Sequence, residues 1–383
     1  MGPTVGTTAG PAPASDRRHL HEVDLFRLLT FASVIGVHVL SAATTPDDVP
    51  SGGGQLLLHF TREAFFTLTG FVLMFQALRR PQHPLPFWRK RIPLVLTPYL
   101  TWTVLYSLLA IWTSAPGTPE PTVSRELLTM ATNAVEGTAW YHLYFLLVTL
   151  QLYLVFPALV AGLRRLGRTG HLVVLGVALV LQIAVCVLLT APPANGFGTF
   201  LIAHGYVLLP SYLLYPVVGA LAALHLDQVQ ALVLRFRWAI AGLVVVAIAT
   251  AEVWYLVTVG HGTAPSVASA VFQPTTIAWF LVAVLGLYTL SLVVTAGWRP
   301  GGPARRALAY ASDRSFGIFL AHPLVLAGLL SIAGGWVDAV GSGLTLAALY
   351  LGTVLGSVLL ADVLRRVPAS AALTGRPRLR RGD

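Results

Sequence analysis

The sequence predicts an all-α membrane protein of about ten transmembrane helices with both termini in the cytoplasm. Three features predict this fold class: the composition, the length of the apolar segments and the distribution of basic residues. Of the 383 residues, 56% are hydrophobic and 10% are charged, and the mean hydropathy is +0.74. Soluble domains carry about 25% charged residues. The chain is therefore too poor in polar residues to cover a soluble surface of its size.

The apolar segments have the length that a membrane helix needs. Crossing about 30 Å of hydrocarbon takes about 20 residues in an α-helix. Ten segments are predicted to do so: 25–44, 56–78, 92–113, 139–162, 171–190, 200–224, 239–259, 275–297, 315–333 and 343–364. The longest outside loops, 114–138 and 260–274, contain Pro and Gly and are expected to help shape an outward-facing mouth.

The Lys and Arg residues predict the orientation of these helices. If the chain starts in the cytoplasm, 23 of its 25 Lys and Arg residues fall on the cytoplasmic side, and only Arg62 and Arg125 do not. This asymmetry is the positive-inside pattern. It accounts for the net charge of +10 without nucleic acid, which is not expected as a partner. The expected setting is the lipid bilayer of the plasma membrane, crossed many times.

The chain divides into a membrane domain and two tails. Residues 1–19 are rich in Pro, Gly, Ala and Thr and are expected to be disordered. Residues 20–366 hold the predicted helices, and the basic residues in 367–383 are expected to rest against anionic lipid. The single cysteine, Cys186, excludes an intramolecular disulfide, and no residues have metal-ligand spacing, so no metal is expected.

The first predicted helix carries two ionisable side chains on one face. Arg27 and His38 are eleven residues apart, which places them within about 20° around the helix and about 16 Å apart along it. An ionisable group deep in a membrane is costly unless paired or hydrated, so function is the first interpretation of His38. The alternative is a neutral histidine hydrogen-bonded between helices. Asp24, one turn before Arg27, either serves function with it or forms a simple interfacial salt bridge.

The second predicted helix brings a carboxylate to a similar depth from the outside. Glu63 is expected to orient the His38 imidazole and to stabilise its charged form, as in other base–orienter pairs. The alternative is local pairing of Glu63 with Arg62 and His59.

Five short motifs follow one another along the predicted helices. They are Asp24-Leu-Phe-Arg27 with His38, Phe65-Phe66-Thr-Leu-Thr69-Gly70-Phe71, Phe87-Trp88-Arg89-Lys90-Arg91 with Pro98, Tyr99 and Trp102, Trp140-Tyr-His142-Leu-Tyr-Phe-Leu with Gln151 to Pro157, and Ser315-Phe-Gly-Ile-Phe-Leu320-Ala-His322-Pro323. Together they resemble the acyltransferase-3 family of integral membrane O- and N-acyltransferases. One position departs from the family pattern, since Leu94 stands where many members have a second arginine, three residues after Arg91.

The resemblance implies an enzyme that moves an acyl group, acetyl or succinyl, from cytoplasmic acyl-CoA to a hydroxyl or amine of a cell-surface or exported carbohydrate. No bound cofactor is expected, because acyl-CoA is a substrate. Arg27 and His38 match the family's motif best, so they are the implied catalytic residues. Glu63 is added to them because of its predicted depth beside His38. His38 would act as general base or would carry the acyl group itself.

Donor binding is expected at the cytoplasmic side. Arg89, Lys90 and Arg91 suit the phosphates of CoA, because guanidinium groups bind phosphate bidentately, but they are otherwise explained as topology determinants. Asp24 is also expected to contribute to substrate binding, as the partner of the Arg27 guanidinium. His322 is expected nearer the cytoplasmic side, either helping to bind the donor or packed as a hydrogen-bonded histidine.

Acceptor binding is expected at the outer side. His142, with Trp140 and Tyr141, either lines an acceptor mouth or belongs to an interfacial aromatic belt. One sequence motif most closely resembles the branch of the family associated with surface poly-N-acetylglucosamine modification. This motif is Tyr141-His142-Leu143-Tyr144-Phe145.

A transporter or flippase of a lipid-linked sugar or polysaccharide is the rival class. Broken helices in corresponding halves of the chain would favour it, and no such internal symmetry is visible in the sequence. Thioester-dependent acyl transfer would separate the enzyme from the transporter.

Overall fold

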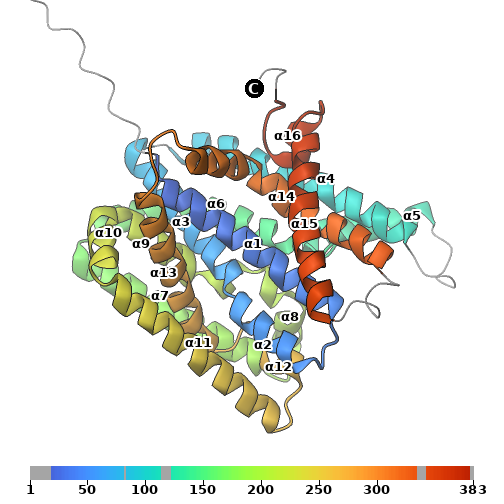
Figure 1. The fold of residues 1–383 in the computed structure, drawn as a ribbon, viewed down its shortest axis with the longest axis horizontal. Coiled ribbons are helices and arrows are strands. Elements are labelled where there is room, and N and C mark those ends of the chain that lie inside the picture. Colours follow the sequence, from blue (N-terminus) through green and yellow to red (C-terminus); the bar gives the residue numbers. More distant parts are fainter. Residues whose placement is uncertain (1–18, 82, 114–121, 334–341, 380–383) are drawn as a thin grey trace, which may run out of the picture.

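The computed structural model describes residues 19–81, 83–113, 122–333 and 342–379. These residues form helices joined by short connections and contain no β-strand (Figure 1). Within them, nine helices are long and apolar enough to cross a membrane, and one bent pair of shorter helices raises the number to ten. The predicted all-α membrane fold is therefore confirmed.

The spanning helices match nine of the ten predicted segments. They are α1 (His21–Ala43), α3 (Thr61–Arg79) with α2 (Val49–Leu58) leading into it, α4 (Pro84–Trp112), α6 (Tyr144–Arg165), α7 (Arg168–Thr190), α11 (Arg237–Gly260), α13 (Thr276–Ala296), α14 (Pro303–Ala333) and α15 (Ser342–Leu364). The two long loops that are predicted to lie outside contain the helices α5 (Val123–Glu136) and α12 (Pro265–Ala268).

The segment predicted at 200–224 is not one continuous helix. It consists of α8 (Gly196–His204), two 3-10 turns, η1 (Gly205–Val207) and η2 (Leu209–Tyr212), and α9 (Leu214–Leu224). After α9 the chain bends by 95° into α10 (Leu226–Arg235). Glycine and proline inside the segment weaken a continuous helix, and hydropathy alone does not register such a break.

Side chains from neighbouring helices satisfy the backbone at this break. Non-helical backbone at membrane depth is tolerated where it is buried in protein and its polar groups are bonded. The Gln151 amide on α6 donates to the Val207 carbonyl (2.7 Å) and accepts from the Leu209 amide (3.0 Å). Gln182 on α7 donates to the Ser211 carbonyl at 2.8 Å. The two glutamines therefore hold the irregular segment in place.

Helix α1 is the central helix of the bundle. It crosses the middle of the molecule in Figure 1 and contacts α2, α3, α13, α14 and α15. Helix α3 packs closely on α9, because Gly70 and Gly219 let the two backbones approach each other. A Cβ atom at Gly70 would overlap the Pro216 carbonyl, and one at Gly219 would overlap the Thr67 carbonyl. Small residues serve this purpose in many membrane helix pairs.

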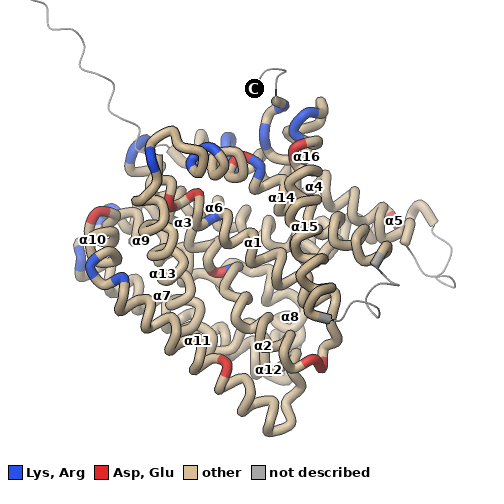
Figure 2. The backbone as a smooth tube through the Cα atoms, in the orientation of Figure 1, with Lys and Arg blue, Asp and Glu red and all other residues tan. Residues whose placement is uncertain are grey.

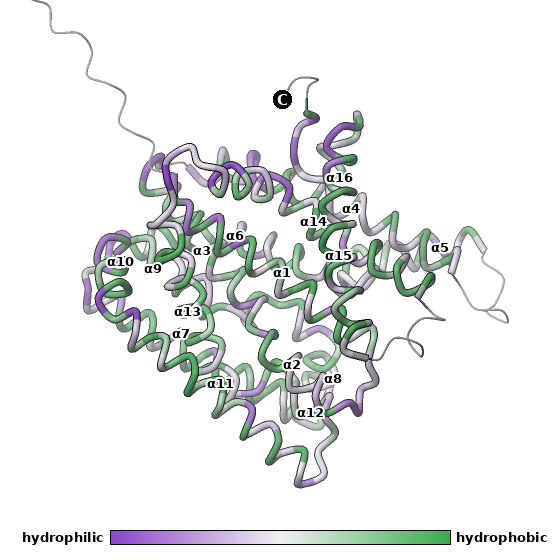
Figure 3. Tube along the Cα trace, in the orientation of Figure 1, coloured by the Kyte–Doolittle hydropathy of each residue, from purple (hydrophilic) through white to green (hydrophobic). Residues whose placement is uncertain are grey.

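The basic residues gather along the upper and left margins of the molecule (Figure 2). Hydrophobic residues cover most of the length of the spanning helices, and hydrophilic stretches lie along those same margins and also near α2, α8 and α12 (Figure 3). Large apolar side chains on α11, such as Val245, Val246 and Leu256, are exposed, as expected of a surface that faces lipid. The arrangement fits the predicted charge asymmetry, while the orientation of the termini stays a prediction.

The two predicted tails differ in how far the structure describes them. Residues 1–18 and 380–383 lie outside the described residues. The rest of the C-terminal tail folds back onto the helices: α16 (Ser370–Thr374) contacts α4 and α14. The Trp102 indole donates to the Leu373 carbonyl at 2.9 Å. This part of the tail is therefore held by protein contacts, in addition to any contact with lipid.

Candidate active site

A cavity of about 130 Å³ lies beside His38, between α1, α3, α6 and α14. On α1 it is lined by Phe31, Val34 and His38, whose spacing places them on one helix face. On α3 it is lined by Arg62 and Phe65, again one turn apart. The remaining lining residues are Val37, His59, Thr61, Tyr141, His142, Tyr144, Phe145, Val271 and Phe319. The cavity is thus mostly aromatic, with a few polar groups that converge on it.

Three histidines from three parts of the chain meet beside this cavity. The ring of His38 lies 5.3 Å from that of His322 and 4.4 Å from that of Tyr141, measured between centroids. The rings of His142 and His322 lie 5.4 Å apart. His38, predicted as the catalytic residue, therefore has two other candidate residues as neighbours.

His322 lies beside His38 and not nearer the cytoplasmic side as predicted. The reason is that α14 begins at Pro303, well before the predicted start at residue 315, so His322 lies far along the helix. Sequence hydropathy placed the start late because residues 303–314 include Arg305, Arg306, Asp313 and Arg314.

Several ring nitrogens in this cluster have no hydrogen bond. His322 Nδ1 donates to the Phe319 carbonyl at 2.7 Å, which leaves the Nε2 lone pair as an acceptor. Among the described residues this buried Nε2 has no partner, and neither ring nitrogen of His142 has a partner of good geometry. Buried polar groups without partners are uncommon, and at a cavity they indicate a site for substrate.

Arg62 is a residue of this site that was not predicted from the sequence. Its guanidinium donates to the Tyr144 hydroxyl at 3.2 Å and lies 5.0 Å from the centre of the Phe272 ring. Its Nε and Nη2 are buried without a hydrogen-bond partner in the part of the chain that the structure describes. The available signal was its position, since Arg62 is one of only two cations that break the predicted charge pattern.

Glu63 lies away from His38. One carboxylate oxygen is 3.9 Å from Arg62 Nη2, and the residue does not line the cavity. Adjacent residues point about 100° apart around a helix, so the turn that aims Arg62 at the cavity aims Glu63 elsewhere. The local alternative is partly realised: Glu63 lies beside Arg62, while His59 Nδ1 bonds to the Ser269 carbonyl at 3.0 Å. The expected His38–Glu63 pair is not formed.

Asp24 and Arg27 form a second polar cluster, at the other end of α1. Arg27 donates to Asp24 at 3.0 Å and to the Ser312 hydroxyl of α14 at 3.1 Å. Ser312 in turn donates to Asp24 at 2.8 Å, and His19 Nε2 lies 2.6 Å from the same carboxylate. The predicted Asp24–Arg27 pair is formed, and it joins α1 to α14.

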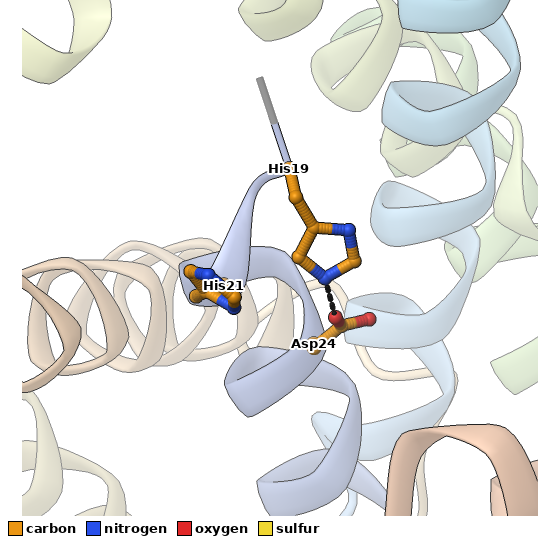
Figure 4. Close-up of side chains that lie close together, drawn as sticks. All are labelled: His19, His21 and Asp24. Carbon is orange, nitrogen blue, oxygen red and sulfur yellow. Dashed lines mark hydrogen bonds and ion pairs between the residues drawn. The ribbon is translucent and has the colours of Figure 1, made fainter. Parts of the chain in front are cut away.

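His19, His21 and Asp24 could also offer three ligand atoms to a cation. These atoms lie within 4.8 Å of one another (Figure 4). Asp24 is already engaged by Arg27, Ser312 and His19, and His19 is largely exposed. Of the three residues, Asp24 is the one that takes part in the α1–α14 contact.

The basic triplet lies near the start of α4. Arg89 and Lys90 are exposed, and Arg91 donates to the Gln76 side chain of α3.

A larger cavity of about 610 Å³ lies among α1, α3, α7, α9, α10 and α13, with an almost wholly apolar lining. This cavity is lined by none of the basic triplet, and His38 does not line it either. The structure thus brings together His38, His142 and His322, and separately Asp24 and Arg27.

The fold and the cavity define a multi-pass membrane protein with a histidine-rich site enclosed by its helices. Residues 20–362 match the acyltransferase domain family, which corresponds to the family resemblance of the motifs, and the chain belongs to this family. It is therefore a membrane acyltransferase that acts on groups other than aminoacyl groups. Neither the curated proteins nor the solved structures contain a match to the chain.

Proposed function

We propose that this acyltransferase moves an acetyl or succinyl group from cytoplasmic acyl-CoA to a hydroxyl or amine of a cell-surface or exported carbohydrate. In this proposal His38 is the general base, and the protein acts in the plasma membrane. One observation carries the proposal: His38 lies at a cavity beside His142 and His322, and ring nitrogens of both neighbours have no partner among the described residues.

The chemistry needs one proton acceptor at the attacking oxygen. An imidazole nitrogen of His38 takes the proton of the acceptor hydroxyl as the oxygen attacks the thioester carbonyl. The tetrahedral intermediate then collapses, the carbon–sulfur bond breaks, and the imidazolium returns its proton to the departing thiolate. General-base catalysis of this kind contributes about 10²–10⁴-fold to the rate.

His38 has an alternative role as acyl carrier. Its nitrogen would then attack the thioester first and expel the thiolate, which takes up the imidazole N–H proton. In a second step the acceptor hydroxyl would take the acyl group and return its proton to the imidazole. An acyl-histidine trapped on the protein without acceptor would favour this route, whereas its absence during turnover would favour the base.

His322 is proposed as the residue that positions His38, in the place that the sequence analysis gave to Glu63. Its bond to the Phe319 carbonyl leaves Nε2 as a hydrogen-bond acceptor, and its ring is stacked on that of His38. His142 is proposed to contact the acceptor. Tyr141 also lines the cavity, and both residues belong to the motif that resembles the poly-N-acetylglucosamine branch.

Arg89 and Lys90 are proposed to bind the CoA phosphates. Both are exposed, and they belong to the basic residues that the charge pattern assigns to the cytoplasm. Arg91 is expected to contribute less, because it already donates to Gln76. Arg27 and Asp24 are proposed to fix α1 against α14, and so to position His38.

The test is acyl transfer by the purified protein in nanodiscs, supplied with labelled acetyl-CoA or succinyl-CoA. Surface glycans and lipid-linked sugars would be compared by mass with and without the protein, since a mass difference names the acyl group and the acceptor together. Transport of a lipid-linked sugar without thioester consumption would overturn the proposal. The described residues contain one bent helix pair and no second pair to match it, which gives little support to a transporter.

A further inference from the structure

Arg62 is an unusual residue to find at an aromatic cavity in a membrane protein. Its side chain is 20% exposed, whereas that of the neighbouring Glu63 is 3% exposed. Two of its nitrogens, Nε and Nη2, are buried without a hydrogen-bond partner among the described residues. A guanidinium carries five N–H donors and no acceptor, so only an acceptor or an anion can complete its bonding.

The neighbours of Arg62 leave its hydrogen bonding incomplete. Glu63 balances its charge, but the 3.9 Å between Glu63 Oε1 and Nη2 is too long for a hydrogen bond. The Tyr144 hydroxyl accepts one bond, and the Phe272 and Tyr212 rings offer only their faces, at 5.0 and 5.9 Å. A buried cation that stays incompletely bonded costs free energy, and membrane proteins retain such groups mainly for function.

The Arg62 side chain lines the cavity that contains His38. Arg62 and His38 both line it, and much of the wall between them is apolar, including Phe65, Phe145 and Phe319. Its volume of about 130 Å³ suits a small group more than a long alkyl chain. A group with one reactive end and one charged end would satisfy both residues at once.

We propose that Arg62 is an anion-binding residue of the acyl-transfer site, which binds a carboxylate or phosphate oxygen of the substrate while His38 serves the reacting group. This inference rests on the proposed function and deepens it. The anion has two possible sources: the distal carboxylate of a dicarboxylic acyl group, or an acidic group on the sugar acceptor. Guanidinium binds either chemistry through paired N–H donors.

The test compares matched charged and neutral probes on the purified, full-length protein in nanodiscs. Thermal stability would be measured against succinate and its neutral diamide, succinamide, and against glucuronate and glucose. A ligand that binds the folded state raises the melting temperature according to its affinity. Succinate represents the acyl group and glucuronate the acceptor, so the two pairs distinguish the two sources. This binding measurement requires no acyl transfer.

The main variant replaces Arg62→Gln together with Glu63→Gln, so that no unpaired carboxylate is left buried. We expect the wild type to prefer the charged member of at least one pair, and the double variant to lose that preference. The affinity for that probe should fall about 10- to 150-fold, which is the loss of one charge-assisted contact. Arg62→Lys should keep part of the preference, since it keeps the charge without the planar fork. Arg125→Gln, which removes the other outer cation, is the matched control.

Two results would overturn the proposal. One is a wild type that responds equally to the charged and neutral members of both pairs. The other is a double variant that folds and keeps the preference for the charged probe. Turnover with succinyl-CoA and acetyl-CoA gives a separate reading: if all transfer is absent but anion binding depends on Arg62, the proposed function fails while the anion site stands. An equal loss of turnover with both donors, without any change in binding, would instead assign Arg62 to the developing oxyanion.

Discussion

The two ends of α1 carry polar clusters of opposite character. At one end Asp24, Arg27 and Ser312 bond to one another within 3.1 Å and join α1 to α14. Toward the other end, His38 faces a cavity where His142 and Arg62 keep buried nitrogens without partners among the described residues. The comparison shows that the first cluster is fully bonded within the protein, whereas the second leaves polar atoms without partners beside a cavity. Spacing along the helix cannot distinguish the two clusters, but the hydrogen bonds can.

The largest effect is expected from the orientation of the molecule in the membrane, because the orientation decides which of the two clusters faces the cytoplasm. The charge asymmetry predicts that a reporter fused after Arg381 is cytoplasmic and that a tag inserted within 114–121 is labelled from outside. Labelling of intact and permeabilised cells measures both positions. An externally accessible C-terminus would reverse the comparison, and with it the placement of His38 on the outer side.

The next test separates chemistry from folding at His38. His38→Ala should lower turnover by about 10²–10⁴-fold, because the general base is lost. His38→Gln should restore little, since an amide cannot take the proton. Thermal unfolding and acyl-CoA binding should stay near the wild-type values. His261→Ala is the matched control, because His261 is an exposed histidine at the end of α11. Near-normal turnover in His38→Ala would leave His38 as a packing residue.

A smaller effect is expected at the basic side of the molecule. Arg89→Gln should weaken acyl-CoA binding by about 10- to 150-fold, because it removes one charge-assisted contact with phosphate. Arg91→Gln should weaken binding less, because the Arg91 guanidinium is bonded to Gln76. Calorimetric titration of the inserted protein measures both affinities. Unchanged affinity in Arg89→Gln would leave the basic triplet as a determinant of topology only.

The smallest effect on turnover is expected at the Asp24–Arg27–Ser312 cluster, whose side chains already bond to one another. Arg27→Lys should reduce the free energy of unfolding by about 1–3 kcal/mol, because a lysine cannot serve Asp24 and Ser312 with one planar group. Turnover should fall with it only as far as α1 shifts against α14. Arg306→Lys, at an exposed position of α14, is the control. A loss of turnover as large as that of His38→Ala, with unchanged stability, would show that Arg27 takes part in the chemistry.

Hydropathy and charge predicted most of the fold. Nine of the predicted segments correspond to spanning helices, because length and apolar composition are local properties. The break between His204 and Leu214 was missed, since it is held by Gln151 and Gln182 from other helices. Such bonds depend on which helices are neighbours, and the sequence does not specify that.

The site was predicted only in part, for a related reason. His38 and the Asp24–Arg27 pair follow from helical spacing on a single helix. The convergence of His142 and His322 on His38 depends on how α1, α14 and the start of α6 cross. The choice between Arg62 and Glu63 depends on the rotation of α3, which places one residue at the cavity and its neighbour away from it. Helix rotation is set by packing contacts that no single segment contains.

The close approach of α3 and α9 at Gly70 and Gly219 has a consequence for the evolution of specificity in this protein. Helix α3 has no freedom to move closer to α9, and even one added methyl group on either glycine would push the helices apart. Because α3 carries Arg62 and Phe65, such a change would also alter the width of the cavity at a distance from it. Substitutions at Gly70 or Gly219 could therefore change the width of the cavity although neither residue lines it. Evolution could adjust the specificity of the site in this way.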